Sequence, residues 1–319
     1  MERAADLRVV AFGGGTGLPV LLRGLKDLVG DLTAVVTVAD DGGSSGRIRD
    51  ELGVAPPGDV RNCLVALAER RWLAEVFNYR FEGGRDLRDH SVGNIIIAAL
   101  TDMAGGFCEG VEQAAHFLRA KGRVYPAAAL PLTLFVRYED GSVVRGESVV
   151  REVGKRISRV WVEPEAPAPE GAIEAVSQAD VVVLSAGSLF TSTIPALLGV
   201  GVRAALAGFG GPVIYVANVM TQPGETSGFT VSDHLRAIAE HAGPVVTDVL
   251  VHSGKLPPDV LARYEAEGAH PVELDREEVE AMEVRVHEGE LLADDFGAGV
   301  RHDPQKLARE VLAAALVRL

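Results

Sequence analysis

The chain has 319 residues, 47% of them hydrophobic, and a formal net charge of −14 at pH 7. This acidity argues against nucleic acid or an anionic membrane surface as the main partner, although it leaves room for a nucleotide held by local donors. The apolar runs are too short or too interrupted to insert into a membrane, and the N-terminus does not resemble a signal peptide. Because Cys63 and Cys108 lack metal-ligand spacing and suggest a reducing compartment, we expect a soluble cytoplasmic protein.

The first unit of the chain is a strand, a glycine turn and a helix. Residues 7–12 are apolar and predict a buried parallel strand, and leucines at helical spacing begin at Leu18. The turn between them consists of Gly13, Gly14, Gly15, Thr16 and Gly17. Such a turn lets a ligand approach the backbone, and its N–H groups with the helix N-terminus favour an anion, most often a phosphate. A tight turn without a ligand is the alternative.

This glycine turn matches neither of two familiar phosphate motifs. The dinucleotide fingerprint requires glycine or alanine where the chain has Leu18 or Val20. The P-loop requires a lysine after the glycines, and none follows here. We therefore expect a different type of phosphate-binding turn. A nicotinamide-dependent oxidoreductase is the least favoured function.

A second buried strand is predicted at residues 32–38, which completes a β-α-β unit. Asp40 and Asp41 follow it, so their carboxylates lie at the same sheet edge as the glycine turn. They could bind a divalent cation or a ribose hydroxyl, or one could cap the next helix. The loop continues with candidate contacts to phosphate or sugar oxygens, namely Ser44, Ser45, Gly46 and Arg47.

Helical patterns dominate residues 54–122, which we interpret as an insertion into a core formed by residues 1–53 and 123–319. Asp59 is expected to be the N-cap of the first of these helices. Capping does not explain the polar residues Asn62, His90 and Asn94 together. A ligand role and a structural role for His90 both remain open.

After residue 122 the pattern becomes β-rich and then returns to alternating strands and helices. A β-hairpin region with a third strand is predicted at residues 132–138, 142–151 and 157–162. Buried strands are then predicted at residues 181–184, 213–216 and 246–251, with helices at 172–178 and 305–319. Small polar loops follow these strands, which is the layout of a ligand crevice in an open α/β sheet.

These loops and the final capping segment supply the remaining candidate ligand contacts. They are Gly187, Ser188, Asn218, Thr221, Gln222 and Arg301. Asp303 explains the start of the last helix as its N-cap, whereas capping does not explain Arg301.

Six motifs in this order make the chain similar to the YvcK-like proteins, or gluconeogenesis factors, which are relatives of the CofD 2-phospho-L-lactate transferases. The motifs occupy residues 13–17, 40–47, 58–62, 90–94, 218–226 and 301–303. The resemblance covers nearly the whole chain. It implies a Rossmann-like core with a helical insertion and binding of a UDP-sugar, notably UDP-N-acetylglucosamine. It also implies roles in carbon metabolism, cell-wall precursor supply and cell shape, without a settled catalytic activity.

The chain departs from the family pattern in two places. The transferases usually carry an asparagine early in the motif that here reads Thr-Val-Ala-Asp-Asp at residues 37–41, which favours the regulator branch. The YvcK-like loop is commonly Gly-Pro-Gly-Ser where this chain has Ser-Ala-Gly-Ser at residues 185–188.

We therefore expect an α/β protein with a Rossmann-like, mostly parallel sheet, a helical insertion and a β-hairpin region. Residues 13–17 and 44–47 would hold a pyrophosphate, and the amides and hydroxyl of Asn218, Thr221 and Gln222 would read uracil or the sugar. Arg301 would lie against a phosphate or stack on the base.

The expected function is regulatory, with a UDP-sugar as ligand and no required cofactor. The alternative is a CofD-like transferase of a phosphoryl-linked group that holds Mg²⁺ through Asp40 and Asp41. The expected partners are a protein of cell-envelope synthesis and further copies of this chain, with neither nucleic acid nor membrane insertion.

Overall fold

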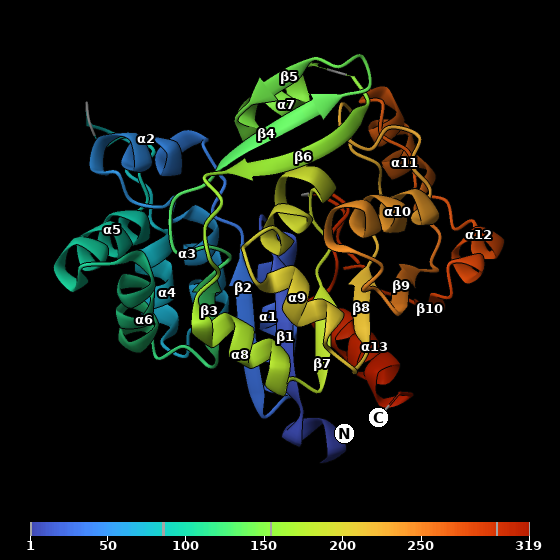
Figure 1. The fold of residues 1–319 in the computed structure, drawn as a ribbon, viewed down its shortest axis with the longest axis horizontal. Coiled ribbons are helices and arrows are strands. Elements are labelled where there is room, and N and C mark those ends of the chain that lie inside the picture. Colours follow the sequence, from blue (N-terminus) through green and yellow to red (C-terminus); the bar gives the residue numbers. More distant parts are fainter. Residues whose placement is uncertain (1, 85–86, 154, 298, 319) are drawn as a thin grey trace.

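The computed structural model describes residues 2–84, 87–153, 155–297 and 299–318 (Figure 1). Its centre is a seven-stranded sheet in the order β10-β9-β8-β7-β1-β2-β3, and all of its paired strands run parallel. The strands are β1 (Arg8–Gly13), β2 (Asp31–Val36), β3 (Arg123–Pro126), β7 (Val181–Leu184), β8 (Val213–Val216), β9 (Asp248–His252) and β10 (Arg285–Gly289). The expected α/β class with a mostly parallel sheet is confirmed.

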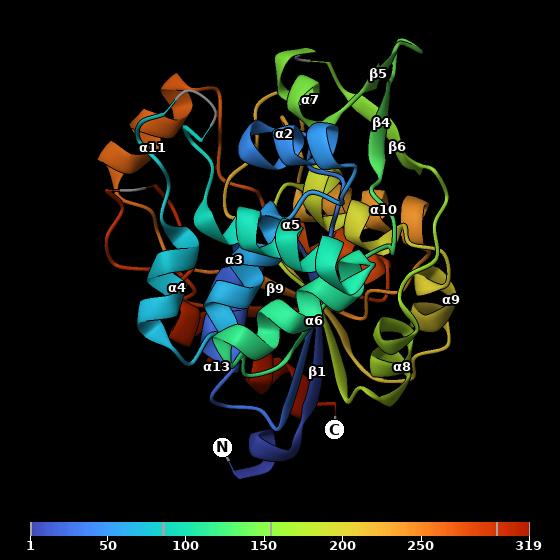
Figure 2. The same cartoon turned by 90° about the vertical axis from the view of Figure 1, so that its left-hand side faces the viewer.

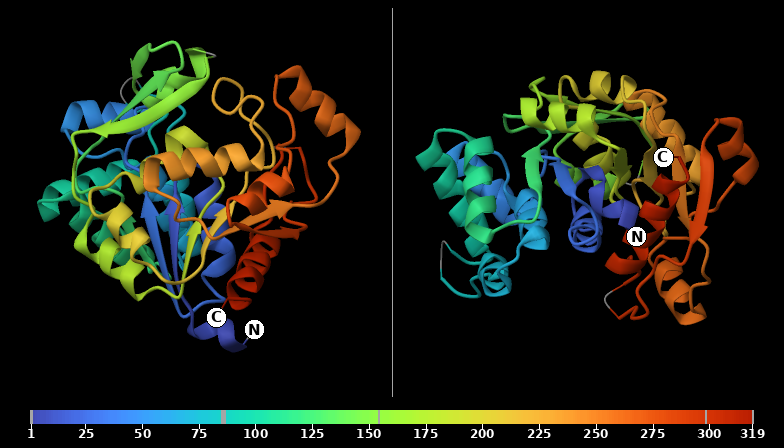
Figure 3. Two further views of the ribbon diagram at one scale, coloured as in Figure 1. Left: turned by 45° about the vertical axis from the view of Figure 1, so that its right-hand side comes forward. Right: turned by 90° about the horizontal axis from the view of Figure 1, so that it is seen from below.

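Helices cover both faces of this sheet, as the buried apolar strands at the centre of a parallel sheet require. On one face lie α1 (Gly17–Leu25) and α13 (Pro304–Leu316), and on the other lie α8 (Glu170–Gln178) and α9 (Val202–Ala207) (Figure 3). Gly24 lets α1 and α13 pack closely, because a Cβ at this position would lie 1.9 Å from the carbonyl oxygen of Pro304.

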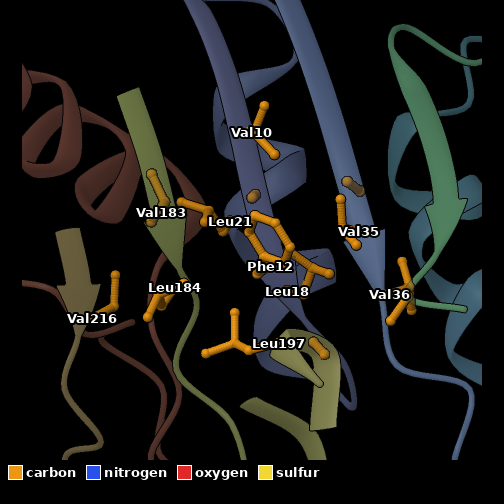
Figure 4. Packing of buried hydrophobic residues seen from close by; sticks show 14 of the residues in the cluster. Val10, Phe12, Leu18, Leu21, Val35, Val36, Val183, Leu184, Leu197 and Val216 are labelled. Atoms are coloured by element: carbon orange, nitrogen blue, oxygen red, sulfur yellow. The ribbon is translucent and has the colours of Figure 1, made fainter. Parts of the chain in front are cut away.

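The core forms between α1 and the central strands (Figure 4). Leu18 and Leu21 of α1 and Phe12 of β1 are completely buried. The neighbouring strands contribute Val35 and Val183, which are also completely buried. Burial of such side chains contributes roughly 1.5–3 kcal/mol each to folding, so the leucine spacing that predicts α1 also fixes how α1 lies on the sheet.

The strand order reverses at β1. The chain passes from β1 to β2 and β3 on one side, and it returns to β7 on the other side before continuing to β8. Because the loops after β1 and β7 leave the sheet in opposite directions, a crevice opens between them at the carboxyl edge.

Helices fill the stretch between β2 and β3 (Figure 2). They are α2 (Gly43–Leu52), α3 (Gly58–Leu67), α4 (Arg71–Asn78), α5 (Val92–Ala104) and α6 (Phe107–Leu118). The division of the chain at residues 53 and 122 stays a prediction.

A small antiparallel sheet lies above the carboxyl edge of the main sheet (Figure 1). It contains β4 (Thr133–Tyr138), β5 (Val143–Arg145) and β6 (Ile157–Glu163). The predicted strand at 142–151 is wrong beyond Arg145, because Gly146 has a φ of +98° and helix α7 (Glu147–Val153) follows.

Besides helix α9, four elements after β8, including strand β10, were not expected from the sequence. The helices are α10 (Val231–Ala242), α11 (Pro258–Ala266) and α12 (Arg276–Ala281). Thr230 and Asp233 form a capping box at the start of α10, a signal that the sequence contains. By contrast, β10 has only half-buried or exposed residues, so it lacks the apolar run that marks the other strands.

No helix in the described ranges is long and apolar enough to cross a lipid bilayer. Residues 1, 85–86, 154, 298 and 319 fall within the predicted core and insertion ranges, and Leu319 falls within the predicted final helix. They lie outside the described residues.

Candidate functional site

A cavity of about 600 Å³ opens at the carboxyl edge of the sheet, where the strand order reverses. Loops after β1, β2, β7 and β8 meet there with helices α1 and α3 and with the segment before α13. The predicted contacts that line the cavity are Gly15, Thr16, Gly17, Asp40, Asn62, Gly187, Ser188, Asn218, Thr221, Gln222 and Arg301. Residues that are more than 280 positions apart in the sequence therefore share one cavity.

The glycine turn is held tightly between β1 and the loop after β7. A Cβ at Gly17 would lie 1.7 Å from the carbonyl oxygen of Ala186, and Gly15 has a φ of +58°. Gly13 and Gly14 lie in the same turn but outside the cavity lining, and their missing side chains make room for Ser185 and Thr37. The turn therefore presents its second half to the cavity.

Asp59 contacts this turn instead of capping α3. Helix α3 begins at Gly58 with Pro57 at the N-cap, so the predicted capping role is wrong. The Gly15 N–H donates to Asp59 Oδ2 at 2.7 Å. Burial, together with the nearby charge of Asp40, raises the pKa of the Asp59 carboxyl to about 6. One N–H of the turn is thus already used by a protein carboxylate.

The adjacent carboxylates of Asp40 and Asp41 point to different parts of the molecule. Asp40 lines the cavity, accepts a hydrogen bond from the Gly42 N–H at 2.8 Å, and has a pKa raised by burial. Asp41 accepts from the Ser148 N–H at 2.9 Å at the start of α7 and lies outside the lining. The second carboxylate near Asp40 is therefore Asp59 and not Asp41.

Ser44, Ser45, Gly46 and Arg47 form the first turns of α2 rather than an irregular loop. Ser44 Oγ lies 2.9 Å from His90 Nδ1 and accepts a hydrogen bond from Asn94 Nδ2 at 3.1 Å. Arg47 donates to the carbonyl oxygen of Arg88 at 2.7 Å. The structure does not bring these residues to the cavity lining, so a ligand contact from them stays a prediction without geometric support.

His90 and Asn94 lie in this buried cluster, outside the cavity lining. Burial lowers the pKa of His90, which favours the neutral ring as an acceptor from the Ser44 hydroxyl. Ser91 caps α5 by accepting from the Asn94 N–H at 3.2 Å. The cluster joins α2 to α5 and gives the unexplained polar residues of this helix a structural role.

On the other side of the cavity, Asn218 holds the loop after β7. Its Nδ2 donates to the Gly187 carbonyl oxygen at 2.7 Å, and its Oδ1 accepts from the Gly187 N–H at 3.2 Å. Ser188 Oγ donates to Glu225 Oε1 at 2.5 Å and caps a short π-helix, Leu189–Thr193. Two of the predicted ligand contacts, Asn218 and Ser188, thus support the cavity wall.

Thr221 and Gln222 differ in how much hydrogen-bonding capacity they keep. Thr221 Oγ1 accepts from the His270 N–H at 2.9 Å. Gln222 Oε1 is buried and has no hydrogen-bond partner within the described part of the chain. A buried carbonyl oxygen without a partner is costly. Gln222 Oε1 is therefore the strongest candidate to accept a hydrogen bond from a donor group of a ligand.

Arg301 and His302 close the cavity near α13. Arg301 is exposed, and burial lowers the pKa of His302 to about 4, so this imidazole is neutral near pH 7. His302 Nε2 is buried and has no partner among the described residues. Asn62 lines the same region while its Oδ1 accepts from Arg61.

Several cavity residues were missed by the sequence reasoning. They include Arg23, Asp59, Asn78, Glu147, Tyr264 and His302. Helical spacing could have identified Arg23. Counting from Thr16 in steps of four and three residues gives Val20 and Arg23, which share one face of α1 and line the cavity. The described residues contain no group of three or more His, Cys, Asp or Glu side chains that could hold a metal ion.

Comparisons with known proteins agree with this arrangement. The family model for 2-phospho-L-lactate transferase CofD matches residues 9–292. A gluconeogenesis factor of Halalkalibacterium halodurans is 45% identical over 308 residues, which cover 95% of each chain. One from Bacillus subtilis is 44% identical over 305 residues, covering 94% of this chain and 96% of that protein. A crystal structure of a Bacillus halodurans protein has a TM-score of 0.93 at 43% identity and covers 96% of this chain and 99% of that one.

Proposed function

Because the chain belongs to the gluconeogenesis factors of the CofD superfamily, we propose that it is a regulatory protein that binds a UDP-sugar. The observation that carries this proposal is the cavity at the reversal of strand order, with a glycine turn on one wall and, on the other, Gln222 Oε1, which has no hydrogen-bond partner among the described residues. The imide N–H of uracil donates to such an oxygen and is flanked by two carbonyl oxygens that accept from an amide N–H, whereas adenine offers only its exocyclic amino group as a donor. We propose UDP-N-acetylglucosamine as the ligand.

We also propose that ligand occupancy links gluconeogenic growth to the supply of cell-envelope precursors and to cell shape. The names of the relatives support the first of these roles. A cytoplasmic location, a protein partner in envelope synthesis and self-association belong to the same proposal.

Calorimetric titration with UDP-N-acetylglucosamine, an ADP-sugar and NAD tests the ligand class. We expect the UDP-sugar to bind at least about ten-fold more tightly than either competitor, a difference of about 1.4 kcal/mol. Gln222→Leu should reduce this preference, because it removes the oxygen that accepts from the uracil imide and leaves the diphosphate shared by all three ligands unaffected. Equal or tighter binding of NAD would contradict the proposal.

The alternative transferase function has one supporting observation, which is that two carboxylates with raised pKa values, Asp40 and Asp59, share the cavity. Carboxylate oxygens suit Mg²⁺, which would supply charge neutralisation for phosphoryl chemistry. Asp41 does not fit this role, because its carboxylate is engaged at α7.

Chelation and acidic variants separate the two functions. We expect UDP-N-acetylglucosamine binding to survive EDTA with less than about a ten-fold loss. Asp40→Asn should weaken binding more than Asp41→Asn, because only Asp40 lines the cavity. Strict Mg²⁺ dependence, or steady breakdown of the UDP-sugar when an acceptor is supplied, would favour the transferase.

A further inference from the structure

The charged side chains of the cavity are separated along helix α1. Asp59 accepts from the Gly15 N–H just before α1 begins, and Asp40 lies near Asp59. Arg23 lines the cavity near the other end of α1, six residues after Gly17 and therefore about 9 Å along the axis. The glycine turn thus lies beside carboxylates, whereas a guanidinium lies further along the same helix.

Arg23 and Arg301 are two positively charged side chains of the cavity lining. Within the described residues, neither guanidinium has an ion pair or a hydrogen bond. Arg23 is exposed, yet its partial burial against the surrounding protein lowers its pKa, and the charge of Arg301 acts in the same direction. Bringing two guanidiniums together without a counterion is unfavourable, so an anion between them would stabilise this arrangement.

The lining residues one turn before Arg23 on α1 and beyond the first residues of α3 carry no negative charge. Val65 and Asn62 line the cavity from α3, and Val20 lines it from α1. His302 is neutral near pH 7 and keeps Nε2 without a described partner. An anion could therefore approach Arg23 without meeting a carboxylate, which is not true at the glycine turn.

We propose that Arg23, together with Arg301, forms a phosphate-binding subsite in the cavity, and that the phosphates lie here rather than against the carboxylates of the glycine turn. The planar guanidinium matches phosphate oxygens through paired N–H donors. The inference rests on the proposed function where the phosphates are those of the UDP-sugar. The other possible source is a separate phosphorylated small molecule. Sugar hydroxyls then face Asp40 and Asp59, which accept hydrogen bonds from them.

Calorimetry with pyrophosphate and UDP-N-acetylglucosamine on the full chain tests the subsite. Arg23→Gln should weaken at least one of these ligands by about ten-fold or more, and Arg23→Lys should weaken it less. Arg71→Gln is the matched control, because Arg71 is an exposed arginine on α4 outside the cavity. It removes the same charge and should leave both affinities within about two-fold of the unmodified protein. Unchanged affinity of Arg23→Gln for both ligands would overturn the subsite, as would no binding of either by the unmodified protein.

A competition experiment identifies the source of the phosphate. If UDP-N-acetylglucosamine displaces pyrophosphate, the subsite takes the diphosphate of the nucleotide sugar. If pyrophosphate binds the saturated protein and depends on Arg23, the subsite takes a second, phosphorylated ligand. If pyrophosphate binds through Arg23 while UDP-N-acetylglucosamine does not bind, the subsite stands and the proposed function fails. Without ligand, the thermal midpoint of Arg23→Gln should be no lower than that of the control, because the substitution relieves the repulsion between the guanidiniums, and this excludes misfolding as the cause.

Discussion

Gly17→Ala is expected to lower the free energy of unfolding by about 1–3 kcal/mol and to weaken UDP-sugar binding by about ten-fold or more. The added Cβ would lie 1.7 Å from the Ala186 carbonyl oxygen, and backbone on both sides leaves no flexible side chain to move. The turn after β1 and the loop after β7 must therefore separate, which displaces both walls of the cavity. Urea unfolding and calorimetric titration measure the two effects.

Two other glycines serve as controls for this substitution. Gly210→Ala adds the same methyl group where no atom lies within 4 Å, so stability and binding should hardly change. Gly24→Ala should destabilise the chain by a similar amount, because its Cβ would lie 1.9 Å from the Pro304 carbonyl oxygen. This contact is between α1 and α13 and not between the two loops of the cavity, so ligand binding by the folded variant should be weakened less than in Gly17→Ala. If Gly17→Ala and Gly24→Ala had the same effect on binding after correction for stability, the role of the turn as a cavity wall would be refuted.

Asp59 is expected to make stability fall as the pH rises between about 4 and 6. Burial raises the pKa of its carboxyl from 3.8 to about 6, so the folded chain holds this proton more tightly than the unfolded chain does. The favourable contribution is complete below pH 4 and is lost as the pH rises to 6, after which it stays constant. A shift of about two pH units corresponds to about 3 kcal/mol.

Asp59→Asn is expected to remove this pH dependence and to raise the free energy of unfolding at pH 7.5 by up to about 3 kcal/mol. The amide keeps an oxygen that can accept from the Gly15 N–H, but it carries no charge to bury. Asp180→Asn is a control of opposite sign, because the hydrogen bond from Arg8 lowers the pKa of Asp180 and its loss should reduce stability near neutral pH. Urea titrations from pH 4 to 8 measure both variants. A stability curve for Asp59→Asn parallel to that of the unmodified chain would contradict the assigned cause.

The elements that the sequence predicted well are those with strong local patterns. Residues 7–12 and 181–184 are short apolar runs of a kind that only a strand covered on both faces can bury, and both are central strands. The leucines after Gly17 predicted α1 for the same reason. By contrast, β10 has an exposed edge-strand composition, and residues 147–153 became helical after a glycine with positive φ. Local patterns do not encode either outcome strongly.

The sequence by itself determined the fold class, the family and the motifs that meet at one edge of the sheet. It could do so because burial and turn formation depend on residue type and spacing, which are local properties. Only the tertiary structure decided which members of those motifs face the cavity. Asp59 reaches Gly15 across 44 residues, Ser44 turns instead to His90 and Asn94, and Arg23 lines the same cavity as Arg301. Such contacts arise from the way separate helices pack, so the charge on each side of the cavity is a property of the folded chain.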